Sequence, residues 1–267
     1  MSDWDPDRYG RFATERSQPF WDLIELVDAT TVGRMVDLGC GDGALSVEAA
    51  TRLGATALVG VDSSPAMLER TVGVVPPDGM DVAFERGDLA TWTTTSESHR
   101  GWDLVLANAS LQWVPGHEEV LRRWTDALAP RGQLAVQVPA NGTHASHLVA
   151  NEVGATEPFL DALGGQVPPD PSACNVLAPE EYSQILFDLG YESQQVSLRV
   201  YPHVLGSSSD VVEWVRGTTL NRFFERLPAD LHEPFVAAYR AALLRRIGDV
   251  APYFYPFKRI LLVARRP

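Results

Sequence analysis

Three carboxylates and a glycine-rich loop are the residues of this chain best suited to hold a ligand. The loop, Asp37-Leu-Gly-Cys-Gly-Asp-Gly43, begins inside the end of a short apolar run and precedes a stretch of helical spacing. Asp62 and Asp88 follow the next two apolar runs. Glycines let a backbone approach a ligand closely, and a helix N-terminus offers free N–H groups. Because parallel strands end at one edge of a sheet, we expect these carboxylates to bind a ligand there.

Two cofactors fit this loop. Together with Ala44, the loop matches the G-x-G-x-x-A fingerprint of proteins that bind a dinucleotide such as NAD. Asp62 lies where a carboxylate accepts both hydroxyls of an adenosine ribose, which NAD and S-adenosylmethionine (SAM) share. Asp37 suits a ligand with an ammonium and a sulfonium group, and SAM has both. No Tyr-x-x-x-Lys pair for hydride transfer exists, since Lys258 is the only lysine. The pattern therefore favours SAM over NAD, and over a glycine turn that serves packing alone.

Strands and helices are predicted to alternate around these residues. Apolar runs indicate strands at 34–38, 57–61, 82–85, 102–107, 133–138, 196–204 and 260–264. Helical spacing occurs at 19–27, 44–53, 65–71, 118–128 and 180–189. This alternation is typical of an α/β protein with a doubly wound, parallel sheet. Residues 139–178 give a patchy helical signal, and residues 210–247 are strongly helical and could cap the ligand edge.

Length, composition and charge indicate how many domains the chain has and which partners are disfavoured. The chain has 267 residues, of which 45% are hydrophobic and 21% charged, which fits one or two globular domains. Acidic residues number 35 against 22 basic ones, a net charge of −13, which argues against nucleic acid or an anionic membrane as a partner. Two cysteines, a polar N-terminus unlike a signal peptide and no membrane-spanning apolar run predict a cytoplasmic protein.

Several strings along the chain carry a family resemblance. The glycine loop resembles motif I of class I SAM-dependent methyltransferases, which specifies only the cofactor. The other strings are Trp4-Asp-Pro-Asp-Arg-Tyr9, Phe12 with Glu15-Arg16, Val61-Asp-Ser-Ser-Pro-Ala-Met67, Ala107-Asn-Ala-Ser-Leu-Gln-Trp113, Ala135-Val-Gln-Val-Pro139, Glu213-Trp-Val215 and Ile260-Leu-Leu-Val-Ala-Arg-Arg266. Together they resemble the trans-aconitate 2-methyltransferase family over almost the whole length. Carboxyl methyltransferases acting on malonyl carrier protein have strings similar to 61–67 and 107–113, but the first and last strings favour the aconitate family.

The resemblance implies a domain organisation. We expect a Rossmann-like, seven-stranded, mostly parallel sheet with an antiparallel last strand. An N-terminal aromatic arm or lid would occupy residues 1–33 and the methyltransferase domain residues 34–267. A helical cap at about 207–250 would lie between the last two strands.

The resemblance also implies which residues bind SAM. Asp37 would contact the methionine moiety, Asp62 the ribose and Asp88 the adenine, with Asn108 beside the methionine end. The full set of implied cofactor residues is Asp37, Gly39, Cys40, Gly41, Asp62, Ser63, Met67, Asp88, Leu89, Asn108 and Ala109.

The implied acceptor is a small polycarboxylic acid, most simply trans-aconitate, which would leave as its monomethyl ester together with S-adenosylhomocysteine. Its carboxylates need cations and donors, and arginine binds a carboxylate with two parallel N–H bonds. The candidate positioning residues are Trp4, Tyr9, Arg16, Gln112, Trp113, Tyr201, His203, Arg222 and Arg259. We expect no catalytic acid or base, because a carboxylic acid is already ionised at pH 7. We also expect no metal, since His144-x-x-His147 lacks an evident third ligand.

Two alternatives stay open. Residues 154–175 match nothing in the family, and a proline separates Tyr201 from His203, so the acceptor could be another small acid or a secondary metabolite. A protein that binds SAM without turnover is the second alternative. The intact glycine loop argues against it.

Overall fold

The structure is a computed structural model that describes residues 13–92 and 100–267, with no side chains described for residues 13–16. The chain divides into two compact units. One, here called the sheet unit, comprises Gln18–Pro139, Asn175–Arg199 and Arg259–Pro267. The other, here called the helical unit, comprises Met1–Ser17, Ala140–Cys174 and Val200–Lys258.

The strands form one sheet in the order β3-β2-β1-β4-β5-β7-β6. They are β1 (Arg34–Leu38), β2 (Ala57–Asp62), β3 (Asp81–Arg86), β4 (Trp102–Asn108), β5 (Leu128–Pro139), β6 (Ser193–Leu205) and β7 (Tyr253–Arg265). The pairs β1–β2, β1–β4, β2–β3 and β4–β5 are parallel, and β7 is antiparallel to β5. The predicted fold class is confirmed.

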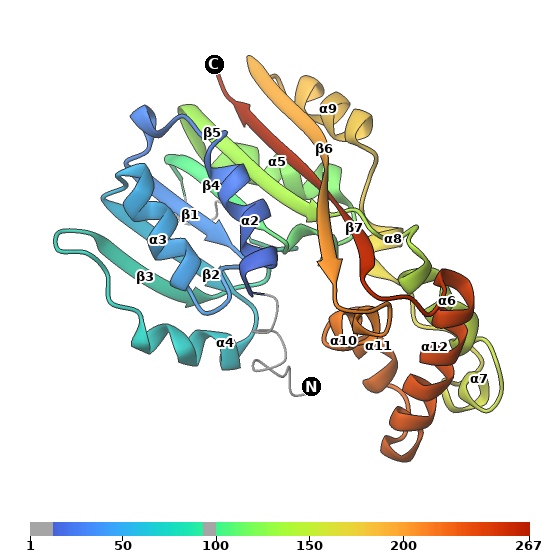
Figure 1. Cartoon of the computed structure of the whole chain (residues 1–267). Helices are drawn as coiled ribbons and strands as arrows, with labels where there is room; N and C mark the ends of the chain where they lie inside the picture. The colour runs from blue at the N-terminus through green and yellow to red at the C-terminus, as the bar shows by residue number, and fades with distance from the viewer. Residues whose placement is uncertain (1–12, 93–99) are drawn as a thin grey trace. The chain divides into compact units, whose positions relative to one another are not determined.

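Helices of the sheet unit cover both faces of the sheet. Figure 1 shows α2 (Ala13–Ile24) and α3 (Ala44–Leu53) on one face, and α5 (His117–Ala127) and α9 (Pro179–Asp188) on the other. Phe20 and Leu23 of α2 belong to a buried cluster with Met35 of β1 and Leu104 of β4. Because both faces are covered, the central strands are apolar on both sides, which is why they are continuous apolar runs in the sequence.

Local signals fix the ends of the helices near the carboxyl edge of the sheet. The helix α3 begins after Gly43 and ends at Leu53, where Gly54 caps it by donating its N–H to the carbonyls of Ala50 and Thr51. The helix α4 (Pro65–Arg70) has Ser64 as its N-cap and proline in its first turn. At the start of α4, the side chain of Ser64 accepts from the N–H of Met67, which would otherwise be unpaired.

The helical unit has its own core. Its helices are α6 (Ala145–Gly154), α7 (Phe159–Ala162), α8 (Pro171–Cys174), α10 (Asp210–Arg216), α11 (Asn221–Phe224) and α12 (His232–Ile247). Phe223 stacks on Phe235 at 4.6 Å between ring centroids, and Phe159 meets Phe235 edge-on at 5.2 Å. A Cβ atom on Gly154 would lie 2.5 Å from the Phe223 ring, so glycine permits α6 to approach α11.

The stretch 210–247, predicted to be strongly helical, is helical in several segments. It is divided into α10, α11, the 3₁₀ turn η5 (Ala229–Leu231) and α12. Gly217 caps the end of α10, and Pro228, with non-helical backbone angles, precedes η5. These two residues interrupt an otherwise helical composition.

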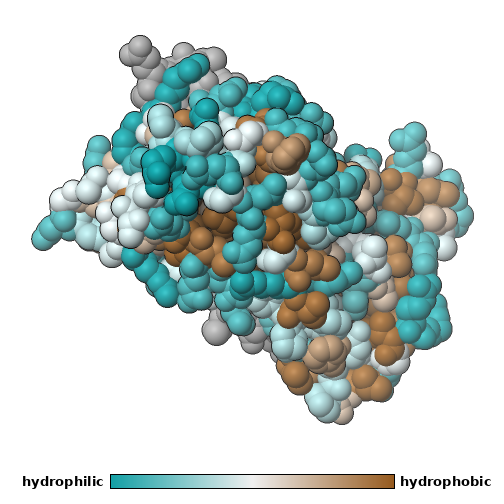
Figure 2. Space-filling view, turned by 90° about the horizontal axis from the view of Figure 1, so that it is seen from above, coloured by the Kyte–Doolittle hydropathy of each residue, from teal (hydrophilic) through white to brown (hydrophobic). Residues whose placement is uncertain are grey.

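One face of the molecule is mainly polar (Figure 2). Figure 2 shows hydrophilic residues over much of one face of the molecule, with hydrophobic residues gathered in patches between them. Within the described residues, no helix is both long enough and apolar enough to span a bilayer.

Candidate functional site

The residues predicted to bind the cofactor meet at the carboxyl edge of β1, β2 and β4. Asp37 pairs in register with Gly60 of β2 and with Leu106 of β4. The N–H of Gly39 donates to the carbonyl of Val61 at 2.7 Å, so the glycine loop begins where β2 ends. The parallel register therefore brings Asp37, Asp62 and Asn108 to one edge, as the sequence predicts.

Asp37 is a buried carboxylate with one oxygen open to a partner. Asp37 as a whole residue is only 3% exposed. The hydroxyl of Ser46 donates to Oδ2, while Oδ1 has no hydrogen-bond partner among the described residues. Burial raises the pKa of Asp37 to about 7, with the charge of Asp62 acting in the same direction and the Ser46 hydrogen bond opposing it. A cationic group beside Oδ1 would satisfy this carboxylate.

The glycine loop is locked against the loop that follows β4. A Cβ atom on Gly39 would lie 2.3 Å from the Cβ atom of Ser110, so only glycine fits there. Ser110 in turn donates its hydroxyl hydrogen to the carbonyl of Leu38 at 2.6 Å. Cys40, between the glycines, is buried, and burial raises the pKa of its thiol well above the usual range. This cysteine is therefore a small packed residue of the loop.

Asp62 is held ready to accept two more hydrogen bonds. The N–H of Gly41 donates to Oδ2 and the N–H of Ser64 to Oδ1, each at 2.9 Å. Each carboxylate oxygen keeps a further lone pair. Met67 lies close to Gly41, since a Cβ atom built on this glycine would be 3.4 Å from the Met67 Cε atom. The arrangement fits a ligand with two adjacent hydroxyl groups.

The remaining predicted cofactor residues lie at the ends of β2, β3 and β4. Ser63 and Asp88 are exposed, and Leu89 is buried. The N–H of Ala90 donates to Oδ1 of Asp88 at 2.8 Å. Ala109, directly after Asn108, has a φ of 51°, a left-handed conformation that is uncommon outside glycine and often occurs at functional sites.

Gln112 and Trp113 lie in the 3₁₀ turn η4 (Leu111–Trp113) after β4. The Gln112 amide Nε2 donates to the carbonyl of Ala109 at 2.6 Å, and its buried Oε1 has no partner among the described residues. The carbonyl of Gln112 accepts from Asn175 Nδ2 at 2.9 Å. Trp113 is 59% exposed. The turn is thus fixed while one amide oxygen stays available to a donor.

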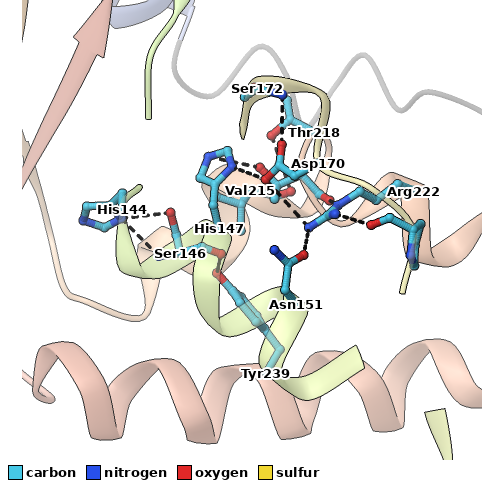
Figure 3. A network of polar contacts seen from close by, with 12 residues as sticks. His144, Ser146, His147, Asn151, Asp170, Ser172, Val215, Thr218, Arg222 and Tyr239 are labelled. Carbon is cyan, nitrogen blue, oxygen red and sulfur yellow. Dashed lines mark hydrogen bonds and ion pairs between the residues drawn. The ribbon is translucent and has the colours of Figure 1, made fainter. Parts of the chain in front are cut away.

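Arg222, a predicted acceptor residue, is occupied inside the helical unit. Figure 3 shows its guanidinium directed at Asp170 and Asn151, with His147 approaching Asp170 from another side. Nη2 donates to Asn151 Oδ1 at 2.6 Å and lies 3.7 Å from Asp170 Oδ2. Nε donates to the carbonyl of Thr219 at 3.1 Å, and Nη1 donates to the carbonyl of Pro168. With these donors used, the geometry favours a structural role for Arg222.

Other predicted acceptor residues are distributed over the chain. Tyr201 and His203 are buried in the helical unit, where the His203 ring lies 5.1 Å from that of Trp214. Arg259 is buried in the sheet unit. Trp4 and Tyr9 lie outside the described residues, as does the side chain of Arg16.

His144 and His147, which we did not expect to bind a metal, have structural partners. His144 caps α6, with its Nδ1 accepting from the N–H of Ser146 at 3.1 Å. His147 Nδ1 lies 2.7 Å from Asp170 Oδ2. Over residues 13–92 and 100–267, no group of three His, Cys, Asp or Glu residues could hold a metal ion.

Sequence reasoning missed three polar residues that shape the edge. Gln137 of β5 contacts both Asn108 and Arg259. His117, whose Nε2 lies 3.0 Å from the carbonyl of Leu111, and Asn175 both hold the turn η4. For Gln137 a signal existed, since it is a polar residue inside an apolar strand. Asn175 gave none, because its partner is 63 residues away.

Comparison with known proteins shows the family to which this chain is similar. The family described as "Methyltransferase domain" matches residues 35–132. The trans-aconitate 2-methyltransferase of Variovorax paradoxus is 36% identical over 265 residues, 99% of this chain and 96% of that protein. That of Methylobacterium nodulans is 37% identical over 268 residues, 100% of this chain and 99% of that protein.

The chain belongs to the trans-aconitate 2-methyltransferase family. Solved structures agree on the fold alone. The YcgJ protein of Bacillus subtilis aligns with a TM-score of 0.58 at 13% identity, over 93% of this chain and 97% of that one. A Haemonchus contortus phosphoethanolamine N-methyltransferase, solved with S-adenosylhomocysteine, aligns with a TM-score of 0.55 at 17% identity, over 94% of this chain and 52% of that one.

The carboxyl edge of this methyltransferase fits SAM. The open Oδ1 of Asp37 suits the ammonium group of the methionine moiety, and burial makes an uncompensated charge there costly. The lone pairs that Asp62 does not use toward Gly41 and Ser64 are acceptors of the kind that two ribose hydroxyls require. As hydrogen-bond acceptors, these two carboxylates are therefore complementary to the ammonium group and the ribose hydroxyls of SAM.

The pKa of Asp37 predicts a pH-dependent affinity for S-adenosylhomocysteine. An ammonium group favours the ionised carboxylate, so the affinity should increase as the pH rises from 6 through about 7, and binding near pH 7 should release protons. This range lies below the ordinary α-amino pKa of about 7.7–8.0, so the ligand stays protonated. Calorimetry in buffers of different ionisation enthalpy measures the release. Asp37→Asn should abolish it, and an unchanged release in that variant would assign the proton to another group.

Proposed function

We propose that this protein transfers the methyl group of SAM to a carboxylate oxygen of trans-aconitate, giving a monomethyl ester. The observation that carries the proposal is the full-length similarity, at 36–37% identity, to relatives named trans-aconitate 2-methyltransferase. The carboxyl edge supports it, because the Asp37 and Asp62 carboxylates suit the ammonium and ribose groups of SAM.

The reaction needs orientation more than acid–base chemistry. SAM, when bound, supplies a methyl group on a sulfonium, which is already a good leaving group. The acceptor carboxylate is ionised at neutral pH, so no side chain has to remove a proton. The task of the protein is to hold the acceptor oxygen in line with the methyl group and to exclude water, and orientation can lower a barrier by roughly 7–11 kcal/mol at its upper limit.

The sheet unit and the helical unit each contain proposed donors to the acceptor, and those of the sheet unit lie at the carboxyl edge. Arg259 is buried there, and its guanidinium can bind a carboxylate through two parallel N–H bonds. Gln112 and Trp113 are proposed to face the acceptor, and Tyr201 and His203 stay proposed donors. The aromatic arm with Trp4, Tyr9 and Arg16 is proposed to close over the site.

The proposed setting is the cytoplasm. Cys40 and Cys174 are both free thiols, which fits a reducing compartment. The net charge of −13 disfavours nucleic acid as a partner. A small polycarboxylate is therefore the partner that we propose.

The test is transfer of labelled methyl from SAM to trans-aconitate, followed by mass spectrometry of the product. We expect a product heavier by one CH₂ whose label is released by mild alkali, because a methyl ester hydrolyses under those conditions. Asp62→Ala serves as the control for SAM-dependent turnover. A label that resists alkali would mean methylation of another kind of atom, and binding of SAM without any transfer would indicate a non-catalytic protein.

A further inference from the structure

Gln137 is a buried amide in an apolar strand. It lies on β5 between Val136 and Val138, both fully buried, and is itself 2% exposed. A buried amide is costly unless its nitrogen and oxygen both find partners. Such a residue in a sheet core therefore indicates a specific hydrogen-bonding task.

The neighbours of Gln137 admit one orientation of its amide. One amide atom of Gln137 lies 3.0 Å from Val138 N and 3.3 Å from Arg259 Nη1, and the other lies 2.8 Å from Asn108 Oδ1. A backbone N–H and a guanidinium can only donate, so the atom facing them has to be the oxygen. The nitrogen then faces Asn108, whose oxygen has to be the acceptor.

This orientation sets the hydrogen-bonding polarity of the carboxyl edge. With its oxygen bonded to Gln137, Asn108 keeps Nδ2 to offer, which is a donor. Arg259 has only donors as well. Carboxylates accept hydrogen bonds, and both reactants carry them: the methionine part of SAM and the proposed polycarboxylate.

We infer that Gln137 is a positioning residue that presents the N–H groups of Asn108 and Arg259 to the carboxylates of the two reactants. It touches neither reactant itself. Its single amide joins a residue implied in cofactor binding to one implied in acceptor binding, so it couples the orientation of the two. The acceptor half of this inference rests on the proposed function, and the cofactor half does not.

The test compares two buried glutamines of the same strand. Gln137→Met removes the amide with little change in volume. Gln133→Met is the matched control, because Gln133 is also 2% exposed but bonds to Asp28 and Thr31 at the other end of β5. The readouts are the dissociation constant of S-adenosylhomocysteine by calorimetry, the KM for trans-aconitate and the melting temperature.

We expect Gln137→Met to raise both the dissociation constant and the KM on the order of fivefold to tenfold, as the loss of an orienting hydrogen bond would. Gln133→Met should lower the melting temperature with both constants unchanged. In an Asn108→Ala background, Gln137→Met should no longer affect S-adenosylhomocysteine, and in an Arg259→Ala background it should no longer affect the KM.

A Gln137→Met protein in which either constant equals that of Gln133→Met would overturn the inference. This outcome is separable from failure of the proposed function. If the wild-type protein does not methylate trans-aconitate, the proposed function fails, and the affinity for S-adenosylhomocysteine alone decides the role of Gln137. If the wild-type protein is active and Gln137→Met behaves as the control does, only the inference fails.

Discussion

Asp62→Ala should weaken SAM binding by a hundredfold or more. The side chain is proposed to accept both ribose hydroxyls, and a hydrogen bond to a charged group contributes about 1.5–3 kcal/mol. Two such bonds correspond to on the order of a hundredfold or more in the dissociation constant, since about 1.4 kcal/mol is tenfold. The substitution also frees the N–H groups of Gly41 and Ser64, which now hold the carboxylate in place.

Calorimetry with SAM or S-adenosylhomocysteine measures this change. Asp78→Ala is a suitable control, because it removes an exposed carboxylate of the sheet unit outside the carboxyl edge. Its affinity should equal that of the wild type. An Asp62→Ala protein with unchanged affinity and an unchanged melting temperature would remove Asp62 from the cofactor site.

Asp170→Ala should lower the free energy of unfolding of the helical unit by about 3–5 kcal/mol. Asp170 is buried and accepts contacts from His147 at 2.7 Å and Arg222 at 3.7 Å. Burial alone would raise its pKa, but the contacts with His147 and Arg222 outweigh burial and hold the pKa below its ordinary value. Removing one partner of a buried ion pair leaves the other charge uncompensated, which accounts for the size of the loss.

Denaturant unfolding of the full chain measures this loss, and an exposed ion pair of the same unit provides the control. Arg246 and Glu152 are also bonded, at 2.9 Å, but both side chains are about half exposed. Glu152→Ala should cost no more than about 1 kcal/mol. Equal losses for the two variants would show that the Asp170 network contributes no more than a surface pair.

The same comparison separates two roles for Arg222. A structural arginine should, when replaced by alanine, destabilise the protein in parallel with Asp170→Ala. An acceptor-binding arginine would raise the KM without loss of stability. The contacts of Arg222 favour the first result.

The sheet and the cofactor edge could be predicted because their signals are local. The strand 34–38 is a short apolar run closed by glycine, and its observed bounds are the predicted ones. Asp37 and Asp62 lie at the carboxyl ends of their strands, and parallel pairing of neighbouring strands brings such residues together. Pro65, a residue favoured in the first turn of a helix, indicates the start of α4.

The rest depends on contacts between distant residues. The roles of Arg222 and Asp170 are decided by a partner 52 positions away, and no spacing in the sequence reveals such a pair. The hydrogen-bonding polarity at Gln137 depends on three elements meeting, β4, β5 and β7. Gly39 reads as a ligand-binding glycine in the sequence, but the structure adds a packing reason, the close approach of Ser110.

The most direct measurement of the central claim is the kcat/KM for methyl transfer from SAM to trans-aconitate, with cis-aconitate, citrate and isocitrate as comparators. We predict transfer to trans-aconitate with a kcat/KM at least about tenfold above that for each comparator, since misplacement of a carboxylate relative to fixed donors disrupts the required alignment. Equal transfer to all four acids, or transfer to none of them, would contradict the assignment of trans-aconitate as the acceptor.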